Sequence, residues 1–207
     1  MNISLDVLKK YRACNSGIEC FKYLKTTTVH ETINKCMDLS DDVVLQWTND
    51  KLDKYKWCNW LLSRILPKDE KIKYAIYSAR LVIDIFEEKY PSDNRPRKAI
   101  EAAELYLGGK VTKEQIKDAA FAAAYAAHAT VNYATVNYAT YAAAYAAAYT
   151  AFAAADAAYA ATDAAAYTAY TAADTAYAAA NYSDRKEMFR SIISYGLTLI
   201  SESEVVE

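Results

Sequence analysis

Apolar side chains recur every three or four residues along most of the chain, which is the spacing of one face of an α-helix. The clearest case lies between Lys68 and Lys89. Its apolar stripe consists of Ile72, Ile76, Ala79, Ile83 and Phe86. We expect one continuous helix here, stopped by Pro91, because proline cannot continue a helix.

Further amphipathic segments predict shorter helices at 4–11, 17–24, 30–39, 43–47, 50–66, 97–107 and 186–200. Ser16 is a candidate N-cap for the second of these, and Pro96 suits the first turn of the helix at 97–107. Gly108 and Gly109 should end that helix. Thr112-Lys113-Glu114-Gln115 has the form of a capping box and predicts a new helix start, whereas the acidic tail from Ser201 should fray.

The segment 119–182 consists mainly of Ala, Tyr, Thr and Asn and contains no Gly, Pro, Lys or Arg. From Tyr138 to Asn181, every gap between residues other than Ala and Thr is three or four. These residues are Tyr138, Tyr141, Tyr145, Tyr149, Phe152, Asp156, Tyr159, Asp163, Tyr167, Tyr170, Asp174, Tyr177 and Asn181. The pattern predicts helix with one face of rings and carboxylates and another face of Ala and Thr.

This segment cannot form one straight helix within a compact fold. A helix from 113 to 182 would be ~105 Å long, far beyond the ~35–40 Å span of a domain of this size. At ~100° per residue, Tyr125 also lies about 140° from the direction of Tyr138. We therefore expect three or four shorter helices, with turns near 130–137, where the sequence TVNYA occurs twice, near 154–157 or 161–164, and near 171–175.

The aromatic face defines the candidate protein-binding residues. We expect the Ala face to lie inward and the aromatic stripe outward, because unpaired buried carboxylates are very costly. The alternative is that the rings fill a groove against the amino-terminal helices. If the stripe is an interface, Tyr145, Tyr149, Tyr167 and Tyr170 should be substantially exposed, or buried only between two copies of the chain. The candidates are Tyr138, Tyr141, Tyr145, Tyr149, Tyr159, Tyr167, Tyr170 and Tyr177.

Alternating strand patterns and Asn-Gly hairpins are absent from the sequence, which therefore predicts an all-α multi-helix bundle with an Ala/Tyr-rich helical carboxy-terminal half and no sheet. At 207 residues the chain suits one domain, 1–207. It divides into a mixed-charge helical part (1–118), the Ala/Tyr-rich part (119–182) and a closing helix with its tail (183–207). Their net charges are +3, −3 and −2.

This charge distribution gives no basic footprint for nucleic acid. Asp, Lys or Arg interrupts the apolar runs of the amino-terminal helices before the ~18–20 residues of a membrane span, and the Ala/Tyr-rich part has too much Ala and too many Tyr hydroxyls to prefer lipid. We therefore expect neither a nucleic-acid nor a membrane partner.

The four cysteines form no C-x-x-C pair, and a charged amphipathic helix rather than a signal peptide occupies the first residues. We expect a reduced, cytoplasmic chain with four small buried cysteines. A zinc site can be drawn from Cys14, Cys20, His30 and Cys36, but its spacing matches no zinc module. We expect no metal and no cofactor.

Catalytic motifs are equally lacking in the sequence. It contains no P-loop, no G-x-S-x-G and no H-E-x-x-H, and its two histidines are few for acid–base chemistry. Asp156, Asp163 and Asp174 lie ~10 and ~16 Å apart by helical rise, too far for a carboxylate pair. We expect no enzymatic activity.

Two stretches carry a resemblance to a known family. They are ACNSGIECF at 13–21 and IDIFEEKYPSDNRPRKAIEAAELYL at 83–107, the latter followed by Gly-Gly and an Ala-rich helix. The chain resembles the alanine-rich "putative immunity protein" group, related to immunity proteins of bacterial polymorphic toxin systems and widespread in bacteriophages. Its Tyr density departs from members whose repeats carry Arg and His. The resemblance implies an all-α fold and a binding role rather than catalysis, with no active site to carry over.

Two hypotheses of function follow. In the first, which the resemblance implies, an intracellular immunity or anti-defence protein neutralises a toxin or host-defence effector by binding it through the Tyr-rich face, with self-association as a further use of that face. In the second, the helices sequester a small molecule such as a nucleotide signal. Arg95, Arg97 and Lys98 form the clustered cations that could bind its anionic group.

Overall fold

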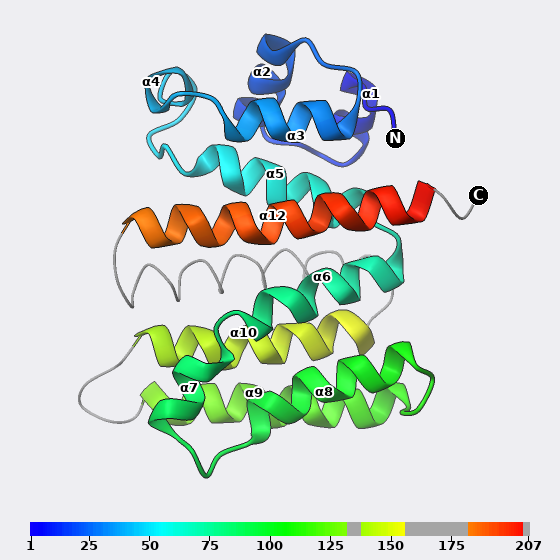
Figure 1. The fold of residues 1–207 in the computed structure, drawn as a ribbon, viewed down its shortest axis with the longest axis vertical. Helices are drawn as coiled ribbons and strands as arrows, with labels where there is room; N and C mark the ends of the chain where they lie inside the picture. The colour runs from blue at the N-terminus through cyan, green and yellow to red at the C-terminus, as the bar shows by residue number, and fades with distance from the viewer. Residues whose placement is uncertain (132–137, 156–181, 205–207) are drawn as a thin grey trace.

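The computed structural model describes residues 1–131, 138–155 and 182–204, and these fold into helices (Figure 1). None of the described residues belongs to a β-strand; an isolated antiparallel bridge joins Asn2 to Thr28. The predicted all-α fold is confirmed for the described chain. No described helix has the length and apolar character needed to cross a membrane.

Four short helices form one end of the molecule: α1 (Leu5–Lys10), α2 (Asn15–Leu24), α3 (Val29–Met37) and α4 (Asp41–Val44) (Figure 1). Side-chain oxygens satisfy the first backbone N–H groups of two of them. Ser4 accepts from Val7 N at the start of α1, and Thr28 accepts from Glu31 N at the start of α3.

The expected N-cap of α2 is wrong. The helix begins at Asn15, and the thiol of Cys14 accepts from Gly17 N in place of a hydroxyl. Ser16 already lies inside the first turn, and its hydroxyl donates to the backbone oxygen of Trp47 at 2.9 Å. A long-range hydrogen bond to the loop after α4 therefore replaces the local cap.

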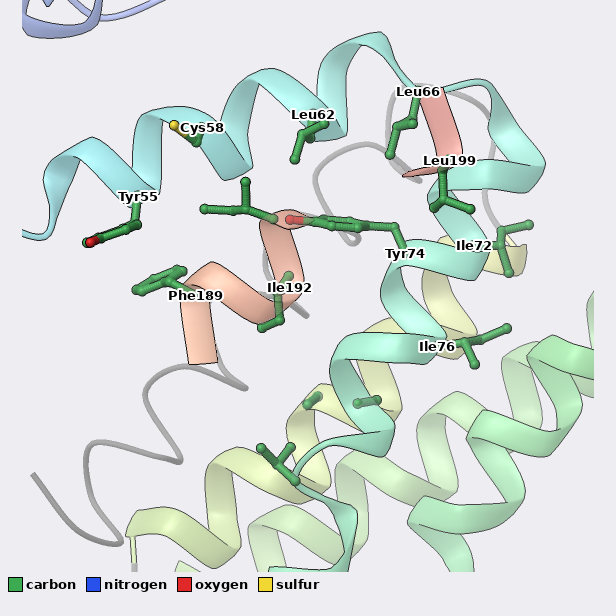
Figure 2. Close-up of a cluster of buried hydrophobic side chains, with 14 of the residues drawn as sticks. Tyr55, Cys58, Leu62, Leu66, Ile72, Tyr74, Ile76, Phe189, Ile192 and Leu199 are labelled. Carbon is green, nitrogen blue, oxygen red and sulfur yellow. The ribbon is translucent and has the colours of Figure 1, made fainter. Parts of the chain in front are cut away.

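Helices α5 (Asp53–Ile65) and α12 (Tyr182–Glu204) lie side by side across the middle of the molecule (Figure 1). The rings of Tyr55 and Phe189 stack between them with centroids 6.0 Å apart, and both side chains are buried. Figure 2 shows this core, to which α6 (Lys68–Arg80) adds Ile72 and Tyr74. Helix α12 is longer than predicted at both ends, and the expectation of fraying from Ser201 is wrong because the helix continues to Glu204.

The helix predicted from Lys68 to Lys89 is two helices, α6 (Lys68–Arg80) and α7 (Ile83–Lys89). Val82 leaves helical geometry between them, with φ −129° and ψ −6°, while its side chain is completely buried. Val82, Ile83 and Ile85 are β-branched and lose rotamer freedom in a helix, so a break costs little here. The change of direction lets Ile83 and Phe86 pack into the core beside α10 (Tyr138–Ala155).

Helix α8 (Arg95–Leu107) starts two residues earlier than predicted, with Pro96 in its first turn, and ends at Gly108 as expected. Gly109 then takes φ +66°, a conformation that glycine adopts without a steric penalty. Helix α9 (Lys113–Val131) follows. Its predicted capping box is confirmed, because Gln115 Oε1 accepts from Thr112 N at 2.8 Å and Thr112 Oγ1 accepts from Gln115 N at 3.3 Å.

Helix α9 ends at Val131 and α10 (Tyr138–Ala155) begins at Tyr138, so the predicted break in the Ala-rich segment is confirmed. The turns expected near 161–164 and 171–175 lie outside the described residues, and the one near 154–157 falls at their edge.

Candidate interaction surface

The Ala-rich helices α9 and α10 run antiparallel beside each other and are covered by α8 (Figure 1). Both helices bury many alanines, whose small side chains let helix axes approach closely. The buried alanines are Ala120, Ala123, Ala126 and Ala127 of α9 and Ala142, Ala143, Ala144, Ala146, Ala147, Ala148 and Ala151 of α10. The Ala face therefore lies inward in the described part of the segment, as predicted.

Thr150 shows how a polar residue of the same face is accommodated. Its side chain is completely buried, and its hydroxyl lies 2.8 Å from Ala146 O and 3.3 Å from Ala75 O. The first oxygen belongs to α10 and the second to α6, so the hydroxyl has partners on both helices. Satisfying a buried hydroxyl in this way avoids its desolvation cost.

Aromatic rings lie on both α9 and α10, and one pair of them joins the two helices. Phe121 of α9 meets Phe152 of α10 edge to face, with ring centroids 5.4 Å apart. One turn along α9, Tyr125 is 68% exposed, and Phe121 itself is 53% exposed. On α10, the rings of Tyr145 and Tyr149 lie 5.8 Å apart. We call these five residues, Phe121, Tyr125, Tyr145, Tyr149 and Phe152, the aromatic strip.

Tyr145 and Tyr149 are each only partly exposed in the protomer, so they lack the substantial exposure expected of them if the stripe were a free interface. Helices α6, α7, α8 and α9 all pack against α10, so little of its circumference remains free. Tyr145 and Phe152 in fact pack against the edge of the core. The described rings of α10 therefore lie between the two predicted alternatives: they are neither freely exposed nor completely buried in the core.

The remaining candidates cannot be placed. Tyr138 and Tyr141 belong to α10, but their side chains lie outside the described part of the chain. Tyr159, Tyr167, Tyr170 and Tyr177 lie wholly outside the described residues.

Phe121 and Tyr125 were not among the predicted binding residues, although they are the most exposed rings of the strip. A signal for them exists in the sequence. Glu114, Asp118, Phe121 and Tyr125 are separated by four, three and four residues, so the two rings continue the charged, solvent-facing stripe of α9. The two rings are exposed because they lie on the same side of α9 as the charged residues before them.

The proposed anion-binding cations lie where α7 is followed by α8, but carboxylates already engage two of them. Arg95 donates to both carboxylate oxygens of Asp93, at 2.8 and 2.6 Å, and this hydrogen bonding lowers the pKa of Asp93. Arg97 donates to both carboxylate oxygens of Glu87 at 2.5 Å and to Asp84 at 3.2 Å. Lys98 is exposed. Capture of an anion by the two arginines would require these pairs to open.

Three of the four cysteines are buried, namely Cys20, Cys36 and Cys58, whereas Cys14 is exposed, contrary to the prediction. Its position at the N-cap of α2 keeps the Cys14 side chain at the surface. Sγ of Cys20 and Sγ of Cys36 are 3.6 Å apart, within hydrogen-bond range and without a disulfide. Among the described residues, no group of three or more His, Cys, Asp or Glu side chains is arranged to hold a metal ion.

Comparison with known proteins gives one match. Residues 64–192 match the model of a family described as "Imm-5 like putative immunity protein". The matched range contains α6 to α10, and with them the aromatic strip and the paired arginines Arg95 and Arg97. No curated protein matches the chain, and neither does any solved structure.

Proposed function

Because the chain belongs to the Imm-5 like putative immunity protein family, we propose that it is an immunity protein that neutralises a protein target by binding it through the aromatic strip. The target in this proposal is a toxin or host-defence effector in the bacterial cytoplasm. Neutralisation requires occupation of the target's surface and no catalytic step by this chain.

The exposure of Phe121 and Tyr125 is the observation that carries this proposal. Exposed aromatic side chains that cluster on one face usually mark an interaction site. Tyr and Phe provide a large contact area at low side-chain entropy cost, and the Tyr hydroxyl tolerates water when the surface is free. The two residues sit on a helix whose opposite side is packed through buried alanines, so the surface is held in place before binding.

The strip also has the graded burial of a binding surface. Phe121 and Tyr125 of α9 are exposed, while Tyr145, Tyr149 and Phe152 of α10 are partly covered. Exposed rings can enter a pocket of the partner, and the partly covered ones can form the floor of the contact. The proposal therefore adds Phe121 and Tyr125 of α9 to the predicted tyrosines, and places the centre of the interface at the contact between α9 and α10.

The alternative, sequestration of an anionic small molecule at Arg95, Arg97 and Lys98, has weaker support. The guanidinium groups of Arg95 and Arg97 already donate to Asp93 and Glu87. An anion would have to displace those carboxylates.

The test is protection of cells in a co-expression screen against a panel of bacterial toxins and host-defence effectors. The variant Phe121→Ser/Tyr125→Ser should lose protection against the target that the wild type counters. Its melting temperature should stay close to that of the wild type, because both rings are more than half exposed. Leu45→Ser is the matched control, since Leu45 is a 46% exposed apolar residue beside α4, outside the matched range.

Full protection by the double variant would contradict the proposal. Light scattering of the free protein tests whether the strip instead mediates self-association. If the wild type self-associates and the double variant does not, the strip joins two copies of the chain rather than the chain and a target.

A further inference from the structure

A cavity of about 270 Å³ lies among α1, α2, α3 and α5, with all its lining residues between Leu8 and Leu61. It is therefore outside the range matched by the family model and far along the chain from the aromatic strip. Its wall is mainly apolar, built from side chains that include Leu8, Phe21, Leu24, Ile33, Trp57 and Trp60.

The polar groups in the wall already have partners inside the protein. The thiol of Cys58 donates to Ile33 O, and Cys36 donates to Lys54 O. The hydroxyl of Thr32 donates to Thr28 O at 2.7 Å. The hydrogen bond with Cys36, together with burial, raises the pKa of Cys20, so this thiol is neutral. Apart from two cations, a ligand inside the cavity meets satisfied, uncharged groups, which favours an apolar body.

Two cations line the same cavity, and they differ in their partners. Lys56 Nζ lies 2.6 Å from a carboxylate oxygen of Asp50 and 2.7 Å from one of Asp53, so its charge is balanced. No side-chain hydrogen bond or ion pair engages Arg12 among the residues that the structure describes, and Arg12 is exposed. Arg12 therefore offers an unbalanced positive charge at the rim of an apolar cavity.

The backbone at Arg12 adds to this observation. Arg12 N donates to Lys9 O and Ala13 N donates to Leu8 O, each at 2.9 Å, which is the Schellman pattern at the end of α1. This motif also requires a residue in the left-handed conformation just after the helix, and Arg12 is that residue, with φ +59°. Glycine is the usual residue here because other side chains are strained in this conformation. The sequence places an arginine on the rim in spite of that strain.

We propose that this cavity binds a small amphiphilic carboxylate, with an acyl chain of about eight to ten carbons among Trp57, Trp60 and Phe21 and its head group at Arg12. The size follows from comparison with an apolar cavity of about 150 Å³, which accommodates benzene, so a void nearly twice as large suits a ligand nearly twice that size. Burial of each methylene contributes to affinity, and the guanidinium selects the anionic head.

The probe is decanoate, titrated below its micelle concentration against the intact protein. Tryptophan fluorescence reports binding, because all three tryptophans lie between residues 47 and 60. We expect saturable one-to-one binding and at least tenfold weaker binding of the uncharged decanol. Arg12→Gly should weaken decanoate binding by about tenfold or more, as expected for loss of a hydrogen-bonded charge. Its melting temperature should not fall, because glycine fits the left-handed position.

Lys25→Gly is the matched control. Lys25 is the other non-glycine residue with positive φ among those described, at +50° after α2, and it does not line the cavity. It loses the same charge and relieves the same backbone strain, so it should bind decanoate as the wild type does. Equal effects of the two variants would overturn the assignment of Arg12.

Gly17→Leu tests the place of the acyl chain. A Cβ on Gly17 would point towards the ring of Trp57 at 3.7 Å, so a leucine there occupies part of the cavity. A folded Gly17→Leu variant should lose decanoate binding. Undiminished binding to that variant, equal binding of decanol and decanoate, or no saturable binding of decanoate to the wild type would each overturn the proposal.

Discussion

Gly196 of α12 lies so close to Tyr74 of α6 that a Cβ built on it would stand 2.8 Å from the ring carbon Cε2. The same Cβ would stand 2.8 Å from Cδ1 of Leu62 on α5. Tyr74 cannot easily move away, because it is completely buried and its hydroxyl donates to Asn59 Oδ1 at 2.9 Å. The three central helices therefore meet at Gly196, where a methyl group would overlap Leu62 and Tyr74 unless the helices moved; Figure 2 shows these two side chains facing α12.

We predict that Gly196→Ala destabilises the protein. Overpacking of a tight core costs about 1–3 kcal/mol, which exceeds the ~1 kcal/mol that alanine gains over glycine in helix propensity. Denaturant unfolding should show a lower midpoint at unchanged slope. Gly108→Ala is the control, because its nearest neighbour to a new Cβ is at 3.5 Å, an ordinary contact. Similar stabilities of the two variants would show that α12 can shift to accept the methyl group.

A second prediction compares two phenylalanines. Phe189 is completely buried against Tyr55, whereas Phe121 is 53% exposed in the aromatic strip. Phe189→Ala should lower the free energy of unfolding by about 3–5 kcal/mol. Phe121→Ala should lower it by under about 1 kcal/mol, since it removes one edge-to-face contact and mainly exposed surface. If Phe121→Ala costs as much as Phe189→Ala, the strip serves the core rather than a partner.

Hydrophobic spacing predicted most of the helices, because that spacing is set by which residues face the core. It failed at Val82, where the apolar stripe continues without a slip while the backbone turns. The spacing shows which residues are buried. Because α6 and α7 both bury the residues of this stripe, the spacing does not indicate where one helix ends and the next begins. Ser16 failed for another reason: its hydrogen bond to Trp47 is set by tertiary contacts rather than by local sequence.

At the candidate site, too, local sequence patterns predicted the helices but not their tertiary contacts. Helical phase correctly separated the aromatic faces of α9 and α10, and helix length predicted a break between them. Neither could show that Phe121 would meet Phe152 across that break, or that four helices would enclose α10 and partly cover Tyr145 and Tyr149. Exposure of a ring depends on neighbours distant in sequence, and a single helical pattern does not contain them.

A third prediction concerns the ion pair of Arg95 and Asp93, whose side chains are 41% and 22% exposed. Hydrogen bonds from Arg95 lower the pKa of Asp93, so the pair stabilises the fold above the unfolded pKa of about 3.9 and ceases to do so as pH falls through the folded value. Arg95→Ala should cost under about 1 kcal/mol near neutral pH, and the difference should shrink below about pH 4.

Urea unfolding at several pH values measures this difference. In an Asp93→Asn background the titrating group is absent, so the effect of Arg95→Ala should no longer change with pH. If the stability loss caused by Arg95→Ala were independent of pH in the wild-type background, the ion pair with Asp93 would not be the source of that loss.

The last prediction distinguishes the four thiols by their access to solvent. Cys14 is exposed, while Cys20, Cys36 and Cys58 are buried, and burial and thiol hydrogen bonding raise the pKa of Cys20. Because the thiolate is the reactive form, a disulfide reagent should label one thiol of the native protein rapidly and the other three only at the rate of opening or after denaturation. Cys14→Ser should abolish the rapid phase, whereas Cys58→Ser should leave it intact. Rapid labelling of two or more thiols in the native wild type would show that the cavity wall opens to solvent far more readily than its packing indicates.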